Sequence, residues 1–192
     1  MQKIILASQS PRRKQLLEWA EVPFDVLVVA TDESYPEGVS NEAIAIHIAR
    51  NKALAIKPLN DLNLPILAAD TIVVLNDKII GKPKDRNDAI NILTELSGKL
   101  HQVITGVFIL HGEKETAFAD CTEVQFHELS LQQIEFYVDH YKPYDKAGAY
   151  AIQEWIGVIG IKWVNGDFYN VMGLPVSRVV QALLNIEQGT TE

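Results

Sequence analysis

The stretch ILAADTIVVLNDKII, residues 66–80, contains two apolar runs, 66–75 and 78–80, separated by Asn76-Asp77. Asn and Asp adopt turn conformations more readily than most residues, so this pair predicts a turn between two strands. Along the rest of the chain, apolar strand-like runs alternate with helical periods. This alternation indicates an α/β or α+β protein, and an α/β fold with a mixed central sheet and flanking helices fits all of these elements.

Local signals place the other elements. We expect further strands at residues 3–7, 24–30, 100–110, 116–126 and 158–163. We expect helices at residues 11–20, 40–57, 85–98, 130–140 and from Pro175 onward. The expected N-caps are Ser10, Ser40 and Asp85, and Ser130 with Gln133 forms a capping box. Strand order does not follow from these signals.

Length and composition narrow the class of protein. The 192 residues suffice for one domain or for two small lobes that share a sheet, and we expect a single domain over residues 1–192. Cys121 is the one cysteine, which favours a reducing compartment. The apolar N-terminal run is too short for a signal peptide, and no stretch approaches the roughly 18 apolar residues of a membrane span. These features predict a cytoplasmic protein without a membrane partner.

The formal net charge of −8 argues against a nucleic-acid partner, because phosphate backbones require a basic stripe and none is visible. A small anionic substrate is compatible with this charge if cations gather locally against the prevailing field. Each Lys or Arg that points inward is therefore informative.

The helix expected at residues 11–20 carries cations beside its buried face. Leu16 and Leu17 define that face, Arg13 lies in the middle of it and Arg12 on its flank. Cations in the first helical turn are also unfavourable for the helix dipole. An anion bound at this N-terminus explains both anomalies.

Ser8 and Ser10 add hydroxyl groups at the same place. Together with free backbone N–H groups and the two guanidinium groups, they can form a phosphate site. The alternative is that Arg13 extends to the surface or pairs with a carboxylate.

Lys52 is anomalous in the same way. It lies at the centre of a stripe formed by Ala45, Ile48, Ala49 and Ile56 on the helix expected at 40–57. A buried, unpaired ammonium costs several kcal/mol, so Lys52 requires an anionic partner. Either a structural Asp or Glu or a bound ligand can fill that role.

Asp70 stands inside an otherwise apolar strand, where aspartate is rare without a partner. Such a carboxylate is a candidate general base or metal ligand, and the alternative is a strand-end residue that caps nearby backbone. Glu33 in an acidic loop and Lys82 in Gly81-Lys82-Pro83 are weak candidates on their own. The five histidines lack zinc-like spacing, and a P-loop motif is absent.

An ordered set of short motifs identifies a family. The motifs are SQSPRR at 8–13, DE at 32–33, NK at 51–52, ADT at 69–71, GKP at 81–83, DKAGAY at 145–150 and GDFYNVMGLP at 166–175. In this order they closely resemble the Maf family of nucleotide pyrophosphatases, from about residue 4 to residue 184.

The resemblance implies a nucleoside-triphosphate pyrophosphatase that needs a divalent cation, Mg²⁺ or Mn²⁺. It also implies two lobes around a cleft, a fold similar to that of the inosine-triphosphate pyrophosphatases, and a homodimer, since members are often dimeric. Asp70 matches the family's proton acceptor. The positions that match its substrate-selectivity residues are Arg12, Thr71 and Gln153. Its other polar cleft residues are matched by Ser8, Arg13, Glu33, Lys52 and Lys82.

The segment DKAGAY followed by Ile152-Gln153 resembles the branch that acts on dTTP and UTP. The chain departs from the common pattern at Ala151 and Glu154, where relatives usually have glycine, and these departures bear on base preference. The sister branch, which prefers 7-methyl-GTP, and a binding role in septum inhibition are the alternatives that the family raises.

The anomalous charges and the resemblance together predict a mechanism. Arg12, Arg13, Lys52 and Lys82 neutralise the triphosphate together with a metal ion held by Glu33 and Asp70, directly or through water. Asp70 acts as base toward the attacking water, as metal ligand, or as both. The amide of Gln153 offers a donor and an acceptor to the pairing edge of uracil or thymine, and Thr71 can add a hydroxyl, which predicts UTP and dTTP over CTP.

Overall fold

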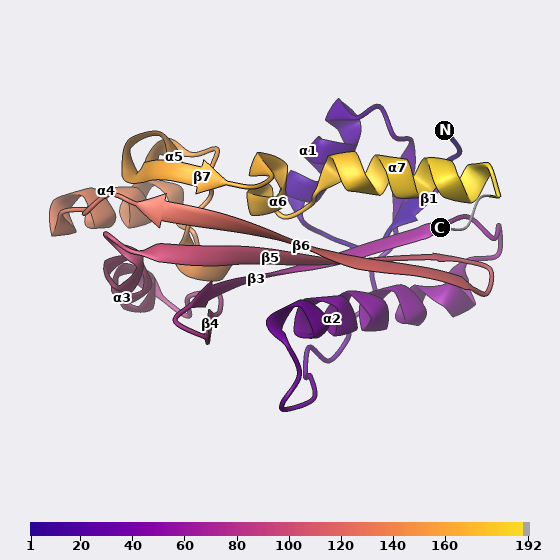
Figure 1. The fold of residues 1–192 in the computed structure, drawn as a ribbon, viewed down its shortest axis with the longest axis horizontal. Coiled ribbons are helices and arrows are strands. Elements are labelled where there is room, and N and C mark those ends of the chain that lie inside the picture. Colours follow the sequence, from indigo (N-terminus) through magenta and orange to yellow (C-terminus); the bar gives the residue numbers. More distant parts are fainter. Residues whose placement is uncertain (190–192) are drawn as a thin grey trace. The chain divides into compact units, whose positions relative to one another are not determined.

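Figure 1 shows the computed structural model, which describes residues 1–189 as an alternation of strands and helices. The strands are β1 (Ile4–Leu6), β2 (Phe24–Val26), β3 (Ile66–Leu75), β4 (Lys78–Ile80), β5 (Leu100–His111), β6 (Lys114–Phe126) and β7 (Ile161–Asn165). The α-helices are α1 (Pro11–Trp19), α2 (Asn41–Ile56), α3 (Arg86–Leu96), α4 (Leu131–Tyr141), α5 (Trp155–Gly160), α6 (Phe168–Met172) and α7 (Val176–Glu187). Two short 3₁₀ helices, η1 (Lys57–Leu59) and η2 (Ala147–Ala149), complete the described elements.

The strands form one mixed sheet. Its order is β2-β1-β3-β5-β6-β7, and β4 pairs with β3 outside this path. β1 runs parallel to both β2 and β3, whereas β4 is antiparallel to β3 and β7 is antiparallel to β6. The predicted mixed sheet with flanking helices is therefore confirmed.

The chain divides into two compact units, and β3, β5 and β6 contribute residues to both. Unit 1 consists of Met1–Asp70, Thr105–Asp120 and the chain from Gly173 onward. Unit 2 consists of Thr71–Ile104 and Cys121–Met172. Among the helices within residues 1–189, none combines the length and apolar composition that a membrane crossing requires.

In unit 1, α2 and α7 cover opposite faces of the strands (Figure 1). Arg50 of α2 pairs with Glu115 on β6, and Arg178 of α7 lies over the ring of Phe118 on the same strand. Because side chains of a strand alternate between faces, residues 115 and 118 mark the two sides. The core on the α2 side includes Ala49, Ala53, Ile56, Ile66, Ala68, Phe108 and Leu110.

The approach of α2 to β5 depends on Gly106. A Cβ atom added at this glycine would lie 2.2 Å from the backbone carbonyl carbon of Ala45. No side chain can occupy that space unless the helix moves. Gly106 therefore sets the distance at which α2, and with it Lys52, meets the sheet.

In unit 2, a buried polar group is enclosed by aromatic rings. His101 on β5 is 1% exposed and meets Phe126 and Tyr150 edge-on. Its Nε2 atom lies 2.8 Å from the Tyr150 hydroxyl, which fixes the end of the DKAGAY segment. Burial lowers the pKa of His101 to about 4, although a backbone interaction at Lys99 partly opposes the shift.

Most predicted helix starts are confirmed. Ser10, Ser40 and Asp85 cap α1, α2 and α3, and Ser130 with Gln133 forms the capping box of α4. Both residues of the predicted turn Asn76-Asp77 have positive φ, as the hairpin between β3 and β4 requires. The local signals were sufficient here because each acts within a few residues.

The strand predicted at residues 158–163 is confirmed in part. Residues Trp155–Gly160 form α5, and the strand is β7, Ile161–Asn165. The apolar run across residues 158–163 is compatible with either structure and does not show where the helix ends. The close approach of Gly157 to the preceding turn, where an added Cβ atom would lie 1.7 Å from the Ile152 carbonyl oxygen, accompanies the helix. The strand expected at 24–30 is also shorter, ending at Val26, and α6 was not expected.

We expect Gly106→Ala to lower the free energy of unfolding by about 1–3 kcal/mol, because the added methyl group overlaps the backbone of α2. Gly81→Ala is the matched control, since no atom lies within 4 Å of its added Cβ. Denaturant unfolding of both variants measures the difference. Equal stability of the two variants would contradict the close packing of α2 on β5.

We expect the protein to lose stability as pH falls from 6.5 toward 4. An unfolded His101 binds its proton near pH 6.5, whereas the folded protein resists protonation until about pH 4, so protons favour the unfolded chain within this window. The loss assignable to His101 is on the order of 3 kcal/mol. His101→Phe should flatten the dependence of the unfolding midpoint on pH, and His140→Gln, an exposed histidine, should not. The same slope in wild type and His101→Phe would refute the assignment.

Candidate functional site

The N-terminus of α1 is built from two serine hydroxyls. The Oγ of Ser10 accepts a hydrogen bond from the Arg13 backbone N–H at 3.5 Å, as an N-cap does. The Oγ of Ser8, a buried residue, accepts from the Ser10 N–H at 3.2 Å. Pro11 at the first helical position has no N–H to satisfy. The chain from β1 into α1 is thus held in one conformation.

Arg13 is held by two oxygen atoms that carry no charge. Its Nη1 donates to the Ser8 hydroxyl at 3.1 Å, and its Nε donates to the Gly173 carbonyl at 2.7 Å. Burial lowers the pKa of Arg13, Asp70 and Glu33 raise it, and the like charge of Arg12 lowers it further. An arginine stays protonated under these influences, so a buried positive charge is positioned beside two carboxylates.

Lys52 joins those two carboxylates. Its Nζ lies 2.6 Å from an oxygen of Asp70 and 2.8 Å from an oxygen of Glu33. The side chains of Lys52 and Asp70 are 19% and 15% exposed, whereas that of Glu33 is 55% exposed. The predicted anionic partner of Lys52 is confirmed, and it is a pair of protein carboxylates.

We call Arg12, Arg13, Glu33, Lys52 and Asp70 the charged cluster. It holds three cations and two carboxylates, all in unit 1. The local excess of positive charge contrasts with the net charge of −8 for the whole chain. Such a cluster attracts an anion and offers it several charge-assisted hydrogen bonds.

The donor set of the charged cluster fits a divalent cation. Asp70 and Glu33 both lie within hydrogen-bonding distance of one ammonium group, so two carboxylates already surround a position that a cation occupies. Mg²⁺ in nucleotide enzymes is commonly held by one or two carboxylates and completes its shell with substrate phosphates and water. Within residues 1–189, no group of three or more His, Cys, Asp or Glu residues has metal-binding geometry.

Unit 2 contains the remaining predicted residues. Thr71 follows Asp70 directly on β3, and Lys82 is exposed in the loop after β4. That loop is joined to the DKAGAY segment, because the Gly148 N–H donates to the Gly81 carbonyl at 3.1 Å. Gly148 has φ +70°, and an added Cβ would lie 3.0 Å from Val73, so only glycine fits this position without strain.

Gln153 lies in a turn between the DKAGAY segment and α5. Its side chain is exposed, whereas its neighbours Ala151 and Ile152 are buried. The turn is closed by a hydrogen bond from the Glu154 N–H to the Ala151 carbonyl at 3.1 Å. The amide of Gln153 is therefore presented to the surroundings by a fixed backbone.

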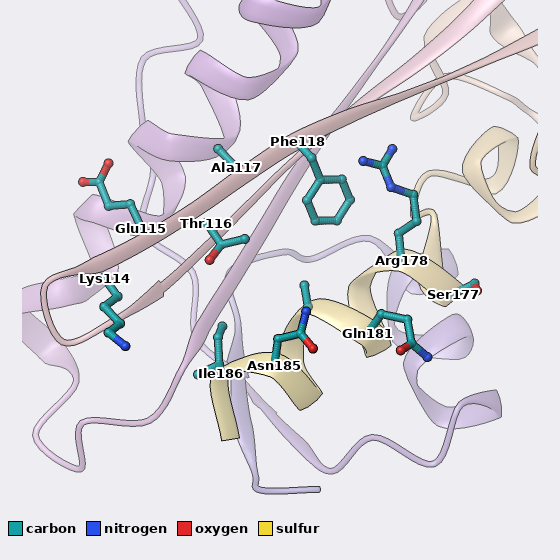
Figure 2. A pocket seen from close by; sticks show the side chains of 11 residues that line it. Lys114, Glu115, Thr116, Ala117, Phe118, Ser177, Arg178, Gln181, Asn185 and Ile186 are labelled. Atoms are coloured by element: carbon teal, nitrogen blue, oxygen red, sulfur yellow. The ribbon is translucent and has the colours of Figure 1, made fainter. Parts of the chain in front are cut away.

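A groove in unit 1 is separate from these residues. It lies between β6 and α7 and has a volume of about 760 Å³. Figure 2 shows side chains such as Thr116, Gln181 and Asn185 on its walls. Its arginine, Arg178, donates to the Ala119 carbonyl at 2.8 Å and pairs with Asp120 at 3.1 Å. That guanidinium already has a carboxylate partner, and no predicted site residue lines the groove.

The structure brings together the predicted residues of unit 1, and it places Thr71, Lys82 and Gln153 in unit 2. Their roles in binding and catalysis stay predictions. Two contributions were missed: the Gly173 carbonyl that holds Arg13, and the Tyr137 hydroxyl that accepts from the Ala151 N–H at 3.2 Å. Gly173 lies in a recognised motif, but a backbone carbonyl has no signature in the residue type. For Tyr137, a hydroxyl on an otherwise apolar helix face was the available signal.

Similar proteins place the chain in a family. A family model described as Maf-like protein matches residues 3–186. A protein of Parabacteroides distasonis named dTTP/UTP pyrophosphatase is 48% identical over 182 residues, which cover 94% of this chain and 94% of that protein. A protein of the same name from Cytophaga hutchinsonii is 49% identical over 180 residues, covering 94% of this chain and 82% of that protein.

Among solved structures, a nucleoside-triphosphatase, dITP/XTP pyrophosphatase, from Mycobacterium abscessus aligns with 98% of this chain and 97% of its own. The TM-score is 0.43 and the sequence identity is 16%. The family assignment rests on the sequence relatives instead. The match over residues 3–186 and the near-half identity across most of both chains show that this chain belongs to the Maf family.

Proposed function

We propose that this protein hydrolyses dTTP and UTP to the nucleoside monophosphate and pyrophosphate, and so removes these nucleotides from the cellular pool. The observation that carries the proposal is the charged cluster, in which Lys52 bridges Asp70 and Glu33 beside Arg13. A triphosphate brings close to four negative charges, and such a ligand needs several cations in one place. The names of the relatives from P. distasonis and C. hutchinsonii support the substrate class.

Asp70 is the proposed general base. It takes a proton from a water molecule, the oxygen of that water attacks the α-phosphorus in line, and the bond to the β-phosphate oxygen breaks. Lys52 orients the Asp70 carboxylate through the 2.6 Å contact. Correct placement of base and nucleophile supplies much of the rate in reactions of this kind.

Arg12 and Arg13 are the proposed phosphate ligands at the start of α1. Ser8 and Gly173 hold the Arg13 guanidinium from one side, which leaves its orientation fixed before substrate arrives. A preorganised cation stabilises developing negative charge without reorganisation during the reaction. The exposed Lys82 adds a further cation for the triphosphate.

Glu33 and Asp70 are the residues that would hold a divalent cation, Mg²⁺ or Mn²⁺. When bound, such an ion neutralises phosphate charge and polarises the phosphoryl group. Lys52 already holds both carboxylates near one point, and this arrangement supports the assignment.

Gln153 and Thr71 are the proposed base readers. Uracil and thymine present acceptor, donor and acceptor groups along their pairing edge, and a Gln amide can meet an adjacent acceptor and donor. Cytosine presents an amino group instead, so one of the polar groups that become buried when the base binds would lack a partner. The placement of Gln153 in a hydrogen-bonded turn supports this role.

The proposal includes the cytoplasm as the site of action and a homodimer as the assembly. The single cysteine, Cys121, supports a reducing compartment. Membership of a family whose proteins are often dimeric supports the second point. Light scattering across a concentration series measures the assembly directly.

Asp70→Asn should abolish pyrophosphate release, with a loss of at least about 100-fold in kcat, because the amide cannot accept the proton from water. The variant should remain folded, since Asn keeps the size of the side chain and an oxygen for Lys52. Asp25→Asn is the control. Asp25 lies on β2 in unit 1, is exposed, and pairs with Lys3 at 2.7 Å. Release of pyrophosphate by Asp70→Asn at the wild-type rate would refute the assignment of the base.

UTP and dTTP should be hydrolysed with a kcat/KM about 10- to 100-fold above that for CTP, the range expected when one buried polar group lacks a partner. A pyrophosphate-release assay over a nucleotide panel, with Mg²⁺, Mn²⁺ or chelator, measures both this ratio and the metal requirement. Comparable rates for CTP and UTP would overturn the proposed base reading. Full activity in chelator would overturn the proposed cation.

A further inference from the structure

The turn that carries Gln153 is attached to α4 through one hydroxyl group. Tyr137 is fully buried in α4, and its hydroxyl accepts a hydrogen bond from the Ala151 N–H at 3.2 Å. The same hydroxyl donates to a carboxylate oxygen, Oε2, of Glu154. Ala151 and Glu154 are the first and last residues of the turn, so Tyr137 ties both of its ends.

Both carboxylate oxygens of Glu154 have partners. Oε2 accepts from Tyr137, and Oε1 lies 3.5 Å from the ammonium of Lys146. The Lys146 side chain is 9% exposed and also contacts Asp145 at 2.7 Å, so the buried lysine has two anionic neighbours. Glu154 is committed to these partners and does not extend toward a substrate base.

The turn is also held from the side of α5. The Gly157 N–H donates to the Glu154 carbonyl at 2.9 Å, and the close approach of Gly157 to the Ile152 carbonyl leaves no room for a side chain. Ile152 is 5% exposed and anchors the turn in the core. Gln153 is thus the one residue of this turn with an exposed side chain, mounted on a backbone fixed at several points.

We propose that Tyr137 and Glu154 are positioning residues that set the orientation of Gln153 and thereby the discrimination between pyrimidine bases. The hydrogen bonds between Tyr137 and the two ends of the turn fix the backbone conformation at residue 153, and with it the direction in which the Gln153 side chain leaves the turn. This inference rests on the proposed function, because it deepens the role given to Gln153. It also gives a role to Glu154, one of the two departures from the common pattern, because its carboxylate accepts from Tyr137. At Ala151 the contact is made by the backbone N–H, which a glycine would supply equally.

A stabilising network and a positioning network differ in what their loss changes. Removal of a purely structural hydrogen bond lowers the unfolding midpoint and scales the rates with all nucleotides alike. Loss of positioning changes the ratio of kcat/KM values between UTP and CTP, because only the contact with the base edge is disturbed.

The test compares four variants in the nucleotide panel. Tyr137→Phe removes both hydrogen bonds between α4 and the turn, and Glu154→Ala removes the one at Glu154. Each variant should lower the ratio of kcat/KM for UTP over CTP by about tenfold, the value of one hydrogen bond. Glu154→Gln keeps an oxygen for Tyr137 and should hold the ratio within about threefold of wild type. Tyr141→Phe is the matched control, since Tyr141 stacks on Tyr137 from the next turn of α4 and is exposed.

Hydrogen exchange of residues 150–155 gives a readout independent of activity. The Ala151 N–H should exchange faster in Tyr137→Phe and Glu154→Ala than in wild type and Tyr141→Phe. An unchanged UTP-to-CTP ratio in both variants, together with a lowered unfolding midpoint, would reduce the network to a structural role and overturn the inference. If wild type itself fails to prefer UTP, the proposed base reading falls, and unchanged exchange at Ala151 would then overturn the positioning separately.

Discussion

The ammonium of Lys52 is the constraint on which the site in unit 1 depends. It projects from an apolar stripe of α2, and the close contact of that helix with β5 at Gly106 fixes where it can reach. At that point it meets Asp70 from β3 and Glu33 from a loop, two carboxylates that would otherwise repel each other. Removal of one partner from such a partly buried set leaves charge uncompensated, and this penalty is larger than the net value of the pair. The lysine therefore holds the carboxylates together before any ligand or metal ion arrives.

Arg13 illustrates a different use of a buried cation. The arginines at positions 50 and 86 pair with carboxylates on the surface, and those partners raise the pKa of each. The guanidinium of Arg13 donates to a hydroxyl and a carbonyl; burial lowers its pKa, and the nearby Asp70 and Glu33 raise it. The two hydrogen bonds fix the direction of this guanidinium. The two groups that hold it, Ser8 and Gly173, belong to motifs at opposite ends of the chain.

The sequence predicted two kinds of feature correctly: local structure that depends on neighbouring residues, and charged residues in apolar segments, which require a partner. The caps of four helices and the Asn76-Asp77 turn depend on neighbours within a few positions. Lys52 and Asp70 were found because a charge on an apolar stripe or strand has a cost that demands a partner. The identity of that partner was not accessible, since 18 residues of chain separate the two and the strand order was unknown. The second half of α5 was assigned to the strand that follows it, because the apolar run is compatible with both structures and carries no signal for the boundary at Gly160.

The proposed function assigns different kinds of selectivity to two groups of residues. In this proposal the charged cluster binds phosphate, which every nucleoside triphosphate carries, so its residues would act on all such substrates alike. The proposed role of Gln153 is to bind a pattern of hydrogen-bond donors and acceptors, which differs from base to base. The orientation of the turn at Gln153 is fixed by the buried network of Tyr137, Glu154 and Lys146, whose hydrogen-bonded and charged groups already satisfy one another. A polar network satisfied in this way keeps the backbone of the turn in one conformation, so the position from which the Gln153 side chain starts is fixed. Departures from the common family pattern at 151 and 154 are therefore compatible with strict base reading as long as the Tyr137 hydroxyl bridges them.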